Sequence, residues 1–141
     1  MIIQDIKPVE TLFKQFCEHY TARCLDEVLR LCSKNMTLWG TGLDEYRVGI
    51  QAIEEQLYRD WSQSTRSTMD WVSFIPTPHS AFWVAGLCNA HLTIEDQDYS
   101  FDNLRVTIAT IEEQGKLKIA HMHGSFPDLR NPAGNSFPVH V

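Results

Sequence analysis

The sequence predicts an α+β fold in which a curved antiparallel or mixed β-sheet wraps around three helices from the first half of the chain, forming a cone. Apolar residues recur at helical spacing in the first half, whereas β-branched and aromatic residues form strand-like runs in the second half. Short turn-like links separate these runs and favour antiparallel neighbours. At 141 residues and 43% hydrophobic content, we expect residues 1–141 to form a single domain.

Three amphipathic helices are predicted, at about residues 5–23, 25–33 and 49–63. The first has apolar residues spaced i, i+3, i+4 and i+7, with Pro8 in its first turn. The second places Asp26 near its positive N-terminal end. The third begins near Gly49, buries one apolar stripe, and is expected to keep Glu54 and Asp60 in water.

Five strands are predicted, at about residues 36–40, 69–75, 80–94, 99–111 and 116–124. The first lies alone between the second and third helices and ends in the glycine-bearing loop "GTGLDEYRVG". The other four follow one another through "PTPH", "EDQD" and "EEQG", as in a meander. The tail, residues 126–141, contains three prolines and is expected to be loop-like.

The last predicted strand carries two histidines, His121 and His123. Side chains alternate across a strand, so both histidines share a face with Ile119, opposite Lys118. Because the lysine belongs in solvent or at a rim, we expect the histidine face to point into the cone. A bulge between Ala120 and His123 would break this parity.

An inward pair of histidines allows three interpretations. Metal binding needs a further ligand with fixed geometry, and Asp128 lies beyond a proline, so we predict no metal site. Acid/base catalysis suits histidine because its ordinary pKa, about 6.5, is close to neutral pH. The third interpretation is structural hydrogen bonding within a polar patch, and the residues alone leave the last two open.

A charged cluster is expected beside the histidines. Arg105 lies on the neighbouring predicted strand, and a buried arginine needs a partner. Asp44 and Glu45, in the loop after the first strand, are the best-placed carboxylates. In a catalytic arrangement His121 would move a proton, Asp44 or Glu45 would orient it, and Arg105 would stabilise negative charge. Alternatively, the arginine only fixes this loop to the sheet.

Aromatic residues complete the expected pocket wall. Trp39 lies at the end of the first strand, Tyr58 on the third helix and Trp83 on the long hairpin. With Glu45 and His123, they are the candidate substrate-binding residues. Each aromatic side chain could equally belong to the core, because large aromatic residues dominate protein cores.

Composition and absent motifs narrow the function. The net charge of −6, with 12 basic and 18 acidic residues, opposes nucleic-acid binding and is compatible with a small neutral, aromatic or cationic ligand. No apolar run approaches the roughly 20 residues that span a bilayer, and four cysteines without a CxxC pair suit a reducing compartment, so we expect a cytoplasmic protein without membrane contact. Nucleotide-binding glycine loops and the GxSxG motif are absent.

The chain resembles the SnoaL-like, ketosteroid-isomerase-like families of the nuclear transport factor 2-like superfamily from Glu10 to Pro138. The resemblance rests on the order of elements and on "LWGTGLDEYRVGIQAIEEQL", "LRVTIA" and "LKIAHMHGSFP" followed by "GNSFP". The last two are similar to a subgroup with a His-x-His final strand, although Leu117 replaces its aromatic residue. The resemblance implies a cone-shaped domain with an internal cavity, usually a homodimer through the sheet.

Members of these families include isomerases, dehydratases, cyclases and hydrolases of small hydrophobic molecules, and also noncatalytic modules, so the fold does not decide function. We expect a pocket protein for a small hydrophobic or aromatic molecule, and, if it is an enzyme, a cofactor-free isomerase or dehydratase-type lyase. The alternative is a noncatalytic ligand-sensing or dimerisation module. The carboxylate, tyrosine and acid of ketosteroid isomerases could not be matched onto predicted strand positions.

Overall fold

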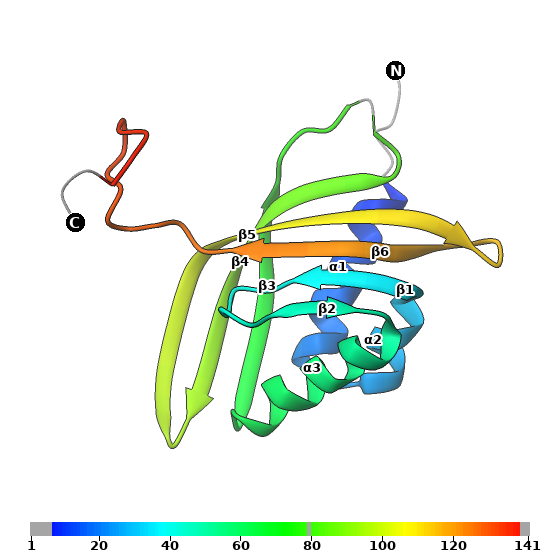
Figure 1. Cartoon of the computed structure of the whole chain (residues 1–141), viewed down its shortest axis with the longest axis horizontal. Helices are drawn as coiled ribbons and strands as arrows, with labels where there is room; N and C mark the ends of the chain where they lie inside the picture. Colours follow the sequence, from blue (N-terminus) through cyan, green and yellow to red (C-terminus); the bar gives the residue numbers. More distant parts are fainter. Residues whose placement is uncertain (1–6, 79, 139–141) are drawn as a thin grey trace.

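The computed structural model describes residues 7–78 and 80–138. Its elements, in chain order, are α1 (Pro8–Thr21), α2 (Leu25–Leu31), β1 (Cys32–Trp39), β2 (Tyr46–Val48), α3 (Ile50–Ser62), β3 (Arg66–Phe74), β4 (Trp83–Ile94), β5 (Gln97–Glu113) and β6 (Lys116–Ser125). Residues 126–138 form neither helix nor strand and lead away from the sheet (Figure 1).

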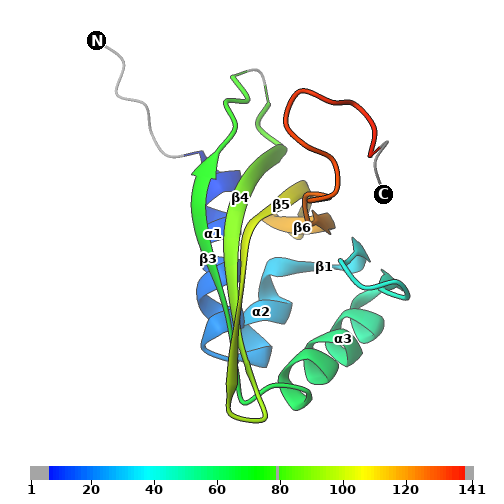
Figure 2. The same ribbon diagram turned by 90° about the vertical axis from the view of Figure 1, so that its left-hand side faces the viewer.

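The six strands form one mixed sheet in the order β2-β1-β6-β5-β4-β3. β1 runs parallel to β6, and all other neighbours are antiparallel. β4 and β5 change direction along their length, so the sheet is strongly bent (Figure 1). Figure 2 shows α1 behind β3, and α3 on the side of β1 and β2. The predicted α+β cone is confirmed.

The core lies between the bent sheet and the helices. α1 buries Phe13 and Phe16, and β5 alternates buried Val106 and Ile108 with exposed residues, as a strand with one covered face should. We call this covered side of the sheet the inner face and the opposite side the outer face. The buried hydrophobic residues form one contiguous cluster that includes both layers.

Several boundaries differ from the prediction. β1 begins at Cys32, directly after α2, because the polar segment "SKN" is already extended. The short strand β2 was not predicted: it extends the sheet within the segment expected to be a loop. β3 begins at Arg66, three residues earlier than expected. The predicted start of the first helix at residue 5 and the end of the tail lie outside the described residues.

A bulge in β6 decides which side chains face inward. Thr110 of β5 pairs with Ile119, but the preceding residue Ala109 pairs with His121, which leaves Ala120 as the extra residue. Ile119 and Met122, three positions apart, are therefore both buried. The expected parity is wrong beyond Ile119, because the bulge turns both histidines to the outer face.

Candidate functional site

Two adjoining cavities lie on the inner face. The inner cavity, of about 120 Å³, is lined mainly by apolar side chains: Phe16, Met36, Leu38, Ile53, Leu57, Val106, Met122 and Gly124. The mouth cavity, of about 360 Å³, is more polar and is lined by Gln63, Ser64, Ser67, Thr68, Ala90, Leu92, Ile94, Phe101 and Phe126. Six residues line both: Tyr20, Thr41, Glu45, Asp60, Met69 and Leu104. The mouth cavity is within the range of roughly 300–1,000 Å³ for small-molecule sites.

A hydrogen-bonded group of three side chains forms the polar part of the site. The Tyr20 hydroxyl, in the last turn of α1, donates to Asp60 Oδ2 at 2.8 Å. Gln56 Nε2 donates to Asp60 Oδ1 at 2.7 Å. Gln56 and Asp60 are four residues apart on α3, so one helical turn separates them on the same side. Both carboxylate oxygens therefore receive a hydrogen bond from protein.

Burial changes the acidity of this group. Burial raises the pKa of the Asp60 carboxyl, and the nearby charge of Glu45 raises it further, while the bonds from Tyr20 and Gln56 act in the opposite direction. Burial also raises the pKa of the Tyr20 hydroxyl, and the negative charge of Asp60 raises it further. Asp60 is therefore easier to protonate than an ordinary aspartate, which suits a group that gives and takes protons.

The loop after β1 holds a second carboxylate against both cavities. Glu45 Oε2 accepts a hydrogen bond from the Gly42 amide at 3.0 Å, and the Gly40 amide donates to the Glu45 carbonyl at 2.8 Å. A Cβ atom at Gly40 would lie 2.1 Å from Glu45 Oε2 and 2.8 Å from Glu45 Cβ. This loop closes around the glutamate only because glycine occupies that position.

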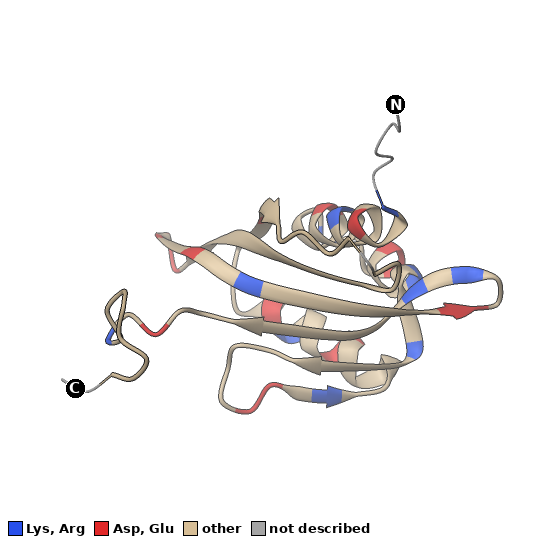
Figure 3. Ribbon diagram, turned by 90° about the horizontal axis from the view of Figure 1, so that it is seen from above, with Lys and Arg blue, Asp and Glu red and all other residues tan. Residues whose placement is uncertain are grey.

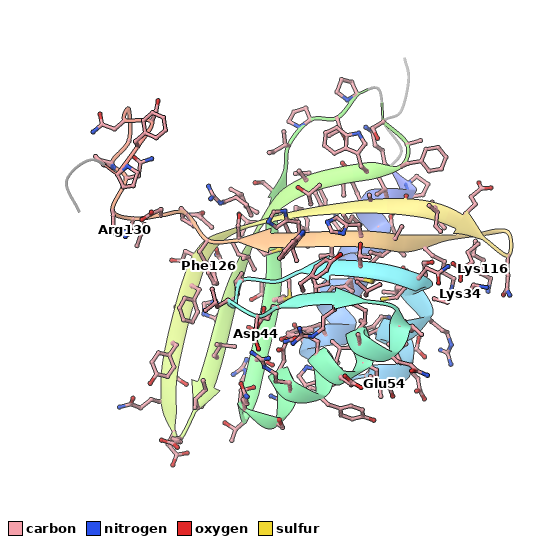
Figure 4. All side chains as sticks on the ribbon, viewed as in Figure 1. Lys34, Asp44, Glu54, Lys116, Phe126 and Arg130 are labelled. Atoms are coloured by element: carbon pink, nitrogen blue, oxygen red, sulfur yellow. The ribbon has the colours of Figure 1, made fainter. Side chains whose placement is uncertain are left out.

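The neighbouring Asp44 points elsewhere. Arg59 of α3 donates to both of its carboxylate oxygens, at 2.9 and 3.0 Å, and holds the pKa of Asp44 below its ordinary value. The same guanidinium is 3.9 Å from Glu45 Oε1. Asp44 is exposed and lines neither cavity; Figure 4 shows it in the loop after β1. The expected pairing of this loop with Arg105 is wrong, since Arg59 takes that place.

The predicted catalytic residues His121 and Arg105 and the predicted substrate-binding residue His123 lie on the outer face. His121 Nδ1 and Thr37 Oγ1 are 2.7 Å apart across the parallel β1–β6 pair. Arg105 is exposed and donates to the carbonyl of Phe126 at 3.2 Å. His123 is exposed and pairs with Thr107 of β5. None of these three basic residues lines either cavity.

The predicted aromatic wall also faces away from the cavities. Trp39 is 49% exposed and stacks on Tyr46 of β2, with ring centroids 4.5 Å apart. Tyr58 and Trp83 are exposed as well, and none of the three predicted aromatic residues lines a cavity. Of the residues proposed from the sequence, only Glu45 lines the cavities.

A model of the SnoaL-like domain matches residues 9–128, most of the chain. The chain belongs to the SnoaL-like family. No curated protein sequence matches this SnoaL-like chain. The family assignment predicted from the sequence is confirmed, while the His-x-His subgroup stays a prediction.

Solved structures that are similar to this SnoaL-like domain share little sequence with it. A scytalone dehydratase-like protein from Novosphingobium aromaticivorans has a TM-score of 0.72 at 10% identity, covering 94% of this chain and 91% of that one. An LEH-like epoxide hydrolase from Mycobacterium tuberculosis has a TM-score of 0.66 at 11% identity, covering 83% and 80%. A Mycobacterium tuberculosis protein in complex with estradiol-17β-hemisuccinate has a TM-score of 0.71 at 14% identity, covering 88% and 96%. At these identities the likeness shows the fold alone.

Sequence reasoning missed Tyr20, Gln56 and Asp60. Asp60 was expected in water, yet it lines both cavities. The signal was present in the third helix, because Ile53, Gln56, Leu57 and Asp60 follow the spacing i, i+3, i+4 and i+7. Polar residues within a buried stripe need partners, which makes them candidates for a site.

Within residues 7–78 and 80–138, no group of three or more His, Cys, Asp or Glu side chains is placed to hold a metal ion. In the same ranges, no helix combines the length and apolar character needed to cross a membrane.

Proposed function

We propose that this SnoaL-like domain binds a small, largely hydrophobic molecule in the two cavities and performs cofactor-free acid/base chemistry on it, as an isomerase or a dehydratase-type lyase does. The observation that carries the proposal is Asp60, a carboxyl group with a raised pKa that lines both cavities. Such groups concentrate at catalytic sites, because proton transfer needs a pKa near the working pH.

Three residues would take part in the proton transfer. Asp60 takes a proton from the substrate or returns it, and the hydroxyl of Tyr20, 2.8 Å away, orients the carboxylate. Glu45 supplies a second carboxylate in the same space, and its charge raises the pKa of Asp60. A pair of carboxyl groups in one site is a recurring arrangement for acid/base catalysis.

Ligand binding without catalysis is the second candidate function. Both oxygens of Asp60 already accept hydrogen bonds from Tyr20 and Gln56, as in a structural network. The bound estradiol derivative in a similar Mycobacterium tuberculosis structure supports a small hydrophobic molecule as ligand under either candidate.

Solvent deuterium exchange separates the two functions. A panel of small ketones and β-hydroxy ketones would be incubated with the protein in D₂O, and exchange and dehydration followed by NMR. We expect at least one compound to react, with loss of about 100-fold or more in Asp60→Asn and a smaller loss in Tyr20→Phe. Glu55→Gln, on the exposed side of α3, is the control. Binding without reaction, or full activity in Asp60→Asn, would refute the catalytic proposal.

We further propose that the outer face pairs with a second copy of the chain. Exposed apolar side chains gather there on neighbouring strands, including Trp39, Tyr46 and Val48. Figure 3 shows no Lys, Arg, Asp or Glu along the last part of β1, the part of β5 between Arg105 and Glu112, or the part of β6 after Lys118. Light scattering after size-exclusion chromatography should give twice the chain mass for the wild type and one chain mass for Trp39→Asp. A monomeric wild type would contradict this proposal.

The proposed compartment is the cytoplasm. All four cysteines are free thiols, and three of them are buried. A reducing compartment maintains that state. Fractionation of cells that express the tagged full chain would test it.

A further inference from the structure

The charged groups of the two cavities and the amide oxygen of Gln56 offer hydrogen-bond acceptors. Glu45 and Asp60 line both cavities, and an ionised carboxylate can accept hydrogen bonds but cannot donate them. The Tyr20 hydroxyl already gives its hydrogen to Asp60. A ligand acceptor placed directly against these groups would be repelled, whereas a ligand donor placed there would complement them.

Gln56 provides an independent sign of a missing donor. Its side chain lines the inner cavity and the residue is 5% exposed. Its Nε2 is bonded to Asp60, yet its Oε1 accepts no hydrogen bond from any residue within the described ranges. A buried acceptor without a partner destabilises the protein, because it has lost its hydrogen bonds to water. A donor on a bound ligand would remove that cost.

The charge of the cavities is negative and poorly compensated. No Lys, Arg or His among the described residues lines either cavity. Arg59 approaches Glu45 only to 3.9 Å, because Asp44 holds its guanidinium at 2.9 and 3.0 Å. Arg23, also nearby, is bound to the carbonyls of Trp61 and Ser64. Negative charge in an apolar enclosure attracts a cation more strongly than it would in water.

Aromatic rings line both cavities. Phe16 and Tyr20 line the inner cavity, and Phe101 and Phe126 meet at the mouth with centroids 5.3 Å apart. Figure 4 shows Phe126 where the chain leaves β6. Aromatic faces bind ammonium groups through their quadrupoles, and they also accept the hydrophobic body of a ligand.

From these four observations we infer that the ligand of the two cavities is a hydrophobic molecule that carries a protonated amine. The ammonium group is directed to the carboxylates of Glu45 and Asp60 and to Gln56 Oε1, and the apolar body lies against Leu104, Val106 and Met122. This inference rests on the binding site of the proposed function and names its ligand class; it does not depend on the reaction.

Three probes of similar size test the ligand class. 2-Phenylethylamine, 2-phenylethanol and 3-phenylpropionate would be titrated into the wild-type protein near neutral pH, with binding followed by calorimetry or NMR shifts. We expect the amine to bind at least about tenfold more tightly than the alcohol, and the carboxylate to bind most weakly. Salt should weaken amine binding and leave alcohol binding nearly unchanged, a readout that needs no variant.

Two variants locate the contact. Glu45→Gln and Gln56→Met keep the side-chain size and should each lower amine affinity about tenfold, while alcohol affinity changes by less than about threefold in Glu45→Gln. Glu55→Gln removes an exposed carboxylate from the same helix as Gln56 and should change neither. Circular dichroism confirms folding before each titration.

The inference is overturned if the alcohol binds as tightly as the amine, if the carboxylate binds more tightly, or if the amine does not bind at millimolar concentration. An equal loss of amine affinity in Glu55→Gln would also overturn it, because amine binding would then depend on the net charge of the protein and not on the carboxylates of the cavities. These outcomes are separable from the catalytic proposal, since deuterium exchange that depends on Asp60 can persist without amine preference. Amine binding can likewise persist without turnover.

Discussion

The two faces of the sheet differ in how they use polar residues. On the inner face, β5 contributes Leu104 and Val106 to an apolar wall, where Asp60 accepts hydrogen bonds from Tyr20 and Gln56. On the outer face, the alternate residues Arg105 and Thr107 are exposed. Most of the residues that suggested chemistry in the sequence lie on the outer face, namely both histidines, the arginine and most of the aromatic residues. The hydrogen-bonded group of Tyr20, Gln56 and Asp60 comes instead from the helices. Residue type alone is therefore a poor guide to the site, because a side chain can line the cavities only if it points to the inner face.

The largest effect is expected from placing the same charge on each face. Val106→Asp puts a carboxylate at a position that is 2% exposed, and we expect it to lower the free energy of unfolding by about 3 kcal/mol or more, or to prevent folding. Thr107→Asp, one residue later on the exposed side, should cost less than about 1 kcal/mol when both variants are made in the monomeric Trp39→Asp background. Urea denaturation of both variants measures the difference. Similar costs would show that the faces are not as distinct as described.

A second pair of variants probes the loop that holds Glu45. Gly40→Ala would bring a methyl group to 2.8 Å from Glu45 Cβ, so we expect a loss of about 1–3 kcal/mol and displacement of the carboxylate. Gly124→Ala is the control, because its Cβ would meet Leu104 Cδ1 at 3.7 Å and Thr41 Cγ2 at 3.8 Å, which are ordinary contacts. Urea melts of both variants measure the loss of stability, and the amine titration of Gly40→Ala measures the displacement of the carboxylate. A neutral Gly40→Ala would mean that the loop adapts easily.

The fold could be predicted because its determinants are periodic. The stripe of α1 and the alternation in β5 repeat over many residues, so one ambiguous position does not change the assignment. β2 is only three residues long and has no period to detect. The bulge at Ala120 depends on how β6 pairs with β5, and pairing register between strands is a property of tertiary structure.

The free energy of unfolding should depend on pH through Asp60, the buried carboxyl group of the inner face. Because burial raises its pKa in the folded state, its protonated form is favoured there, so its contribution is most stabilising below the ordinary value of 3.8 and is lost as pH rises through the raised pKa. Asp60→Asn removes this loss, and the new amide can donate to Gln56 Oε1 after an amide flip. We expect the variant to be more stable than the wild type near neutral pH by about 1 kcal/mol.

Urea titrations of the wild type and Asp60→Asn between pH 4 and neutral pH measure this difference. Asp44→Asn should show the opposite trend, because Arg59 lowers the pKa of Asp44 and its contribution is lost as pH falls. If the two variants follow the same pH trend, Asp60 is not the buried group described above. A variant that is stable yet inactive would separate catalytic use of Asp60 from any structural need for it.

The candidate site was harder to predict than the fold, for reasons visible in single residues. Glu45 was proposed from its place in the loop after the first strand, as a partner for Arg105, and it lines the cavities although that pairing is wrong. Tyr20 and Asp60 meet across 40 residues of sequence, and only the tertiary fold brings the last turn of α1 and the end of α3 close enough for their 2.8 Å hydrogen bond. A close examination of the third helix would still have found Gln56 and Asp60 in its buried stripe.

The smallest effect is expected for the hydrogen bond that His121 makes on the outer face. Thr37→Val keeps the side-chain shape and removes the hydroxyl that lies 2.7 Å from His121 Nδ1. Because both residues are only half-buried, water can replace the lost partner, and we expect a cost of about 0.5–1 kcal/mol in urea denaturation and unchanged activity in the exchange assay. A loss of turnover in Thr37→Val would instead give the histidine a role in the chemistry. It would then require a route through the sheet, because His121 lies on the outer face and the cavities lie on the inner face.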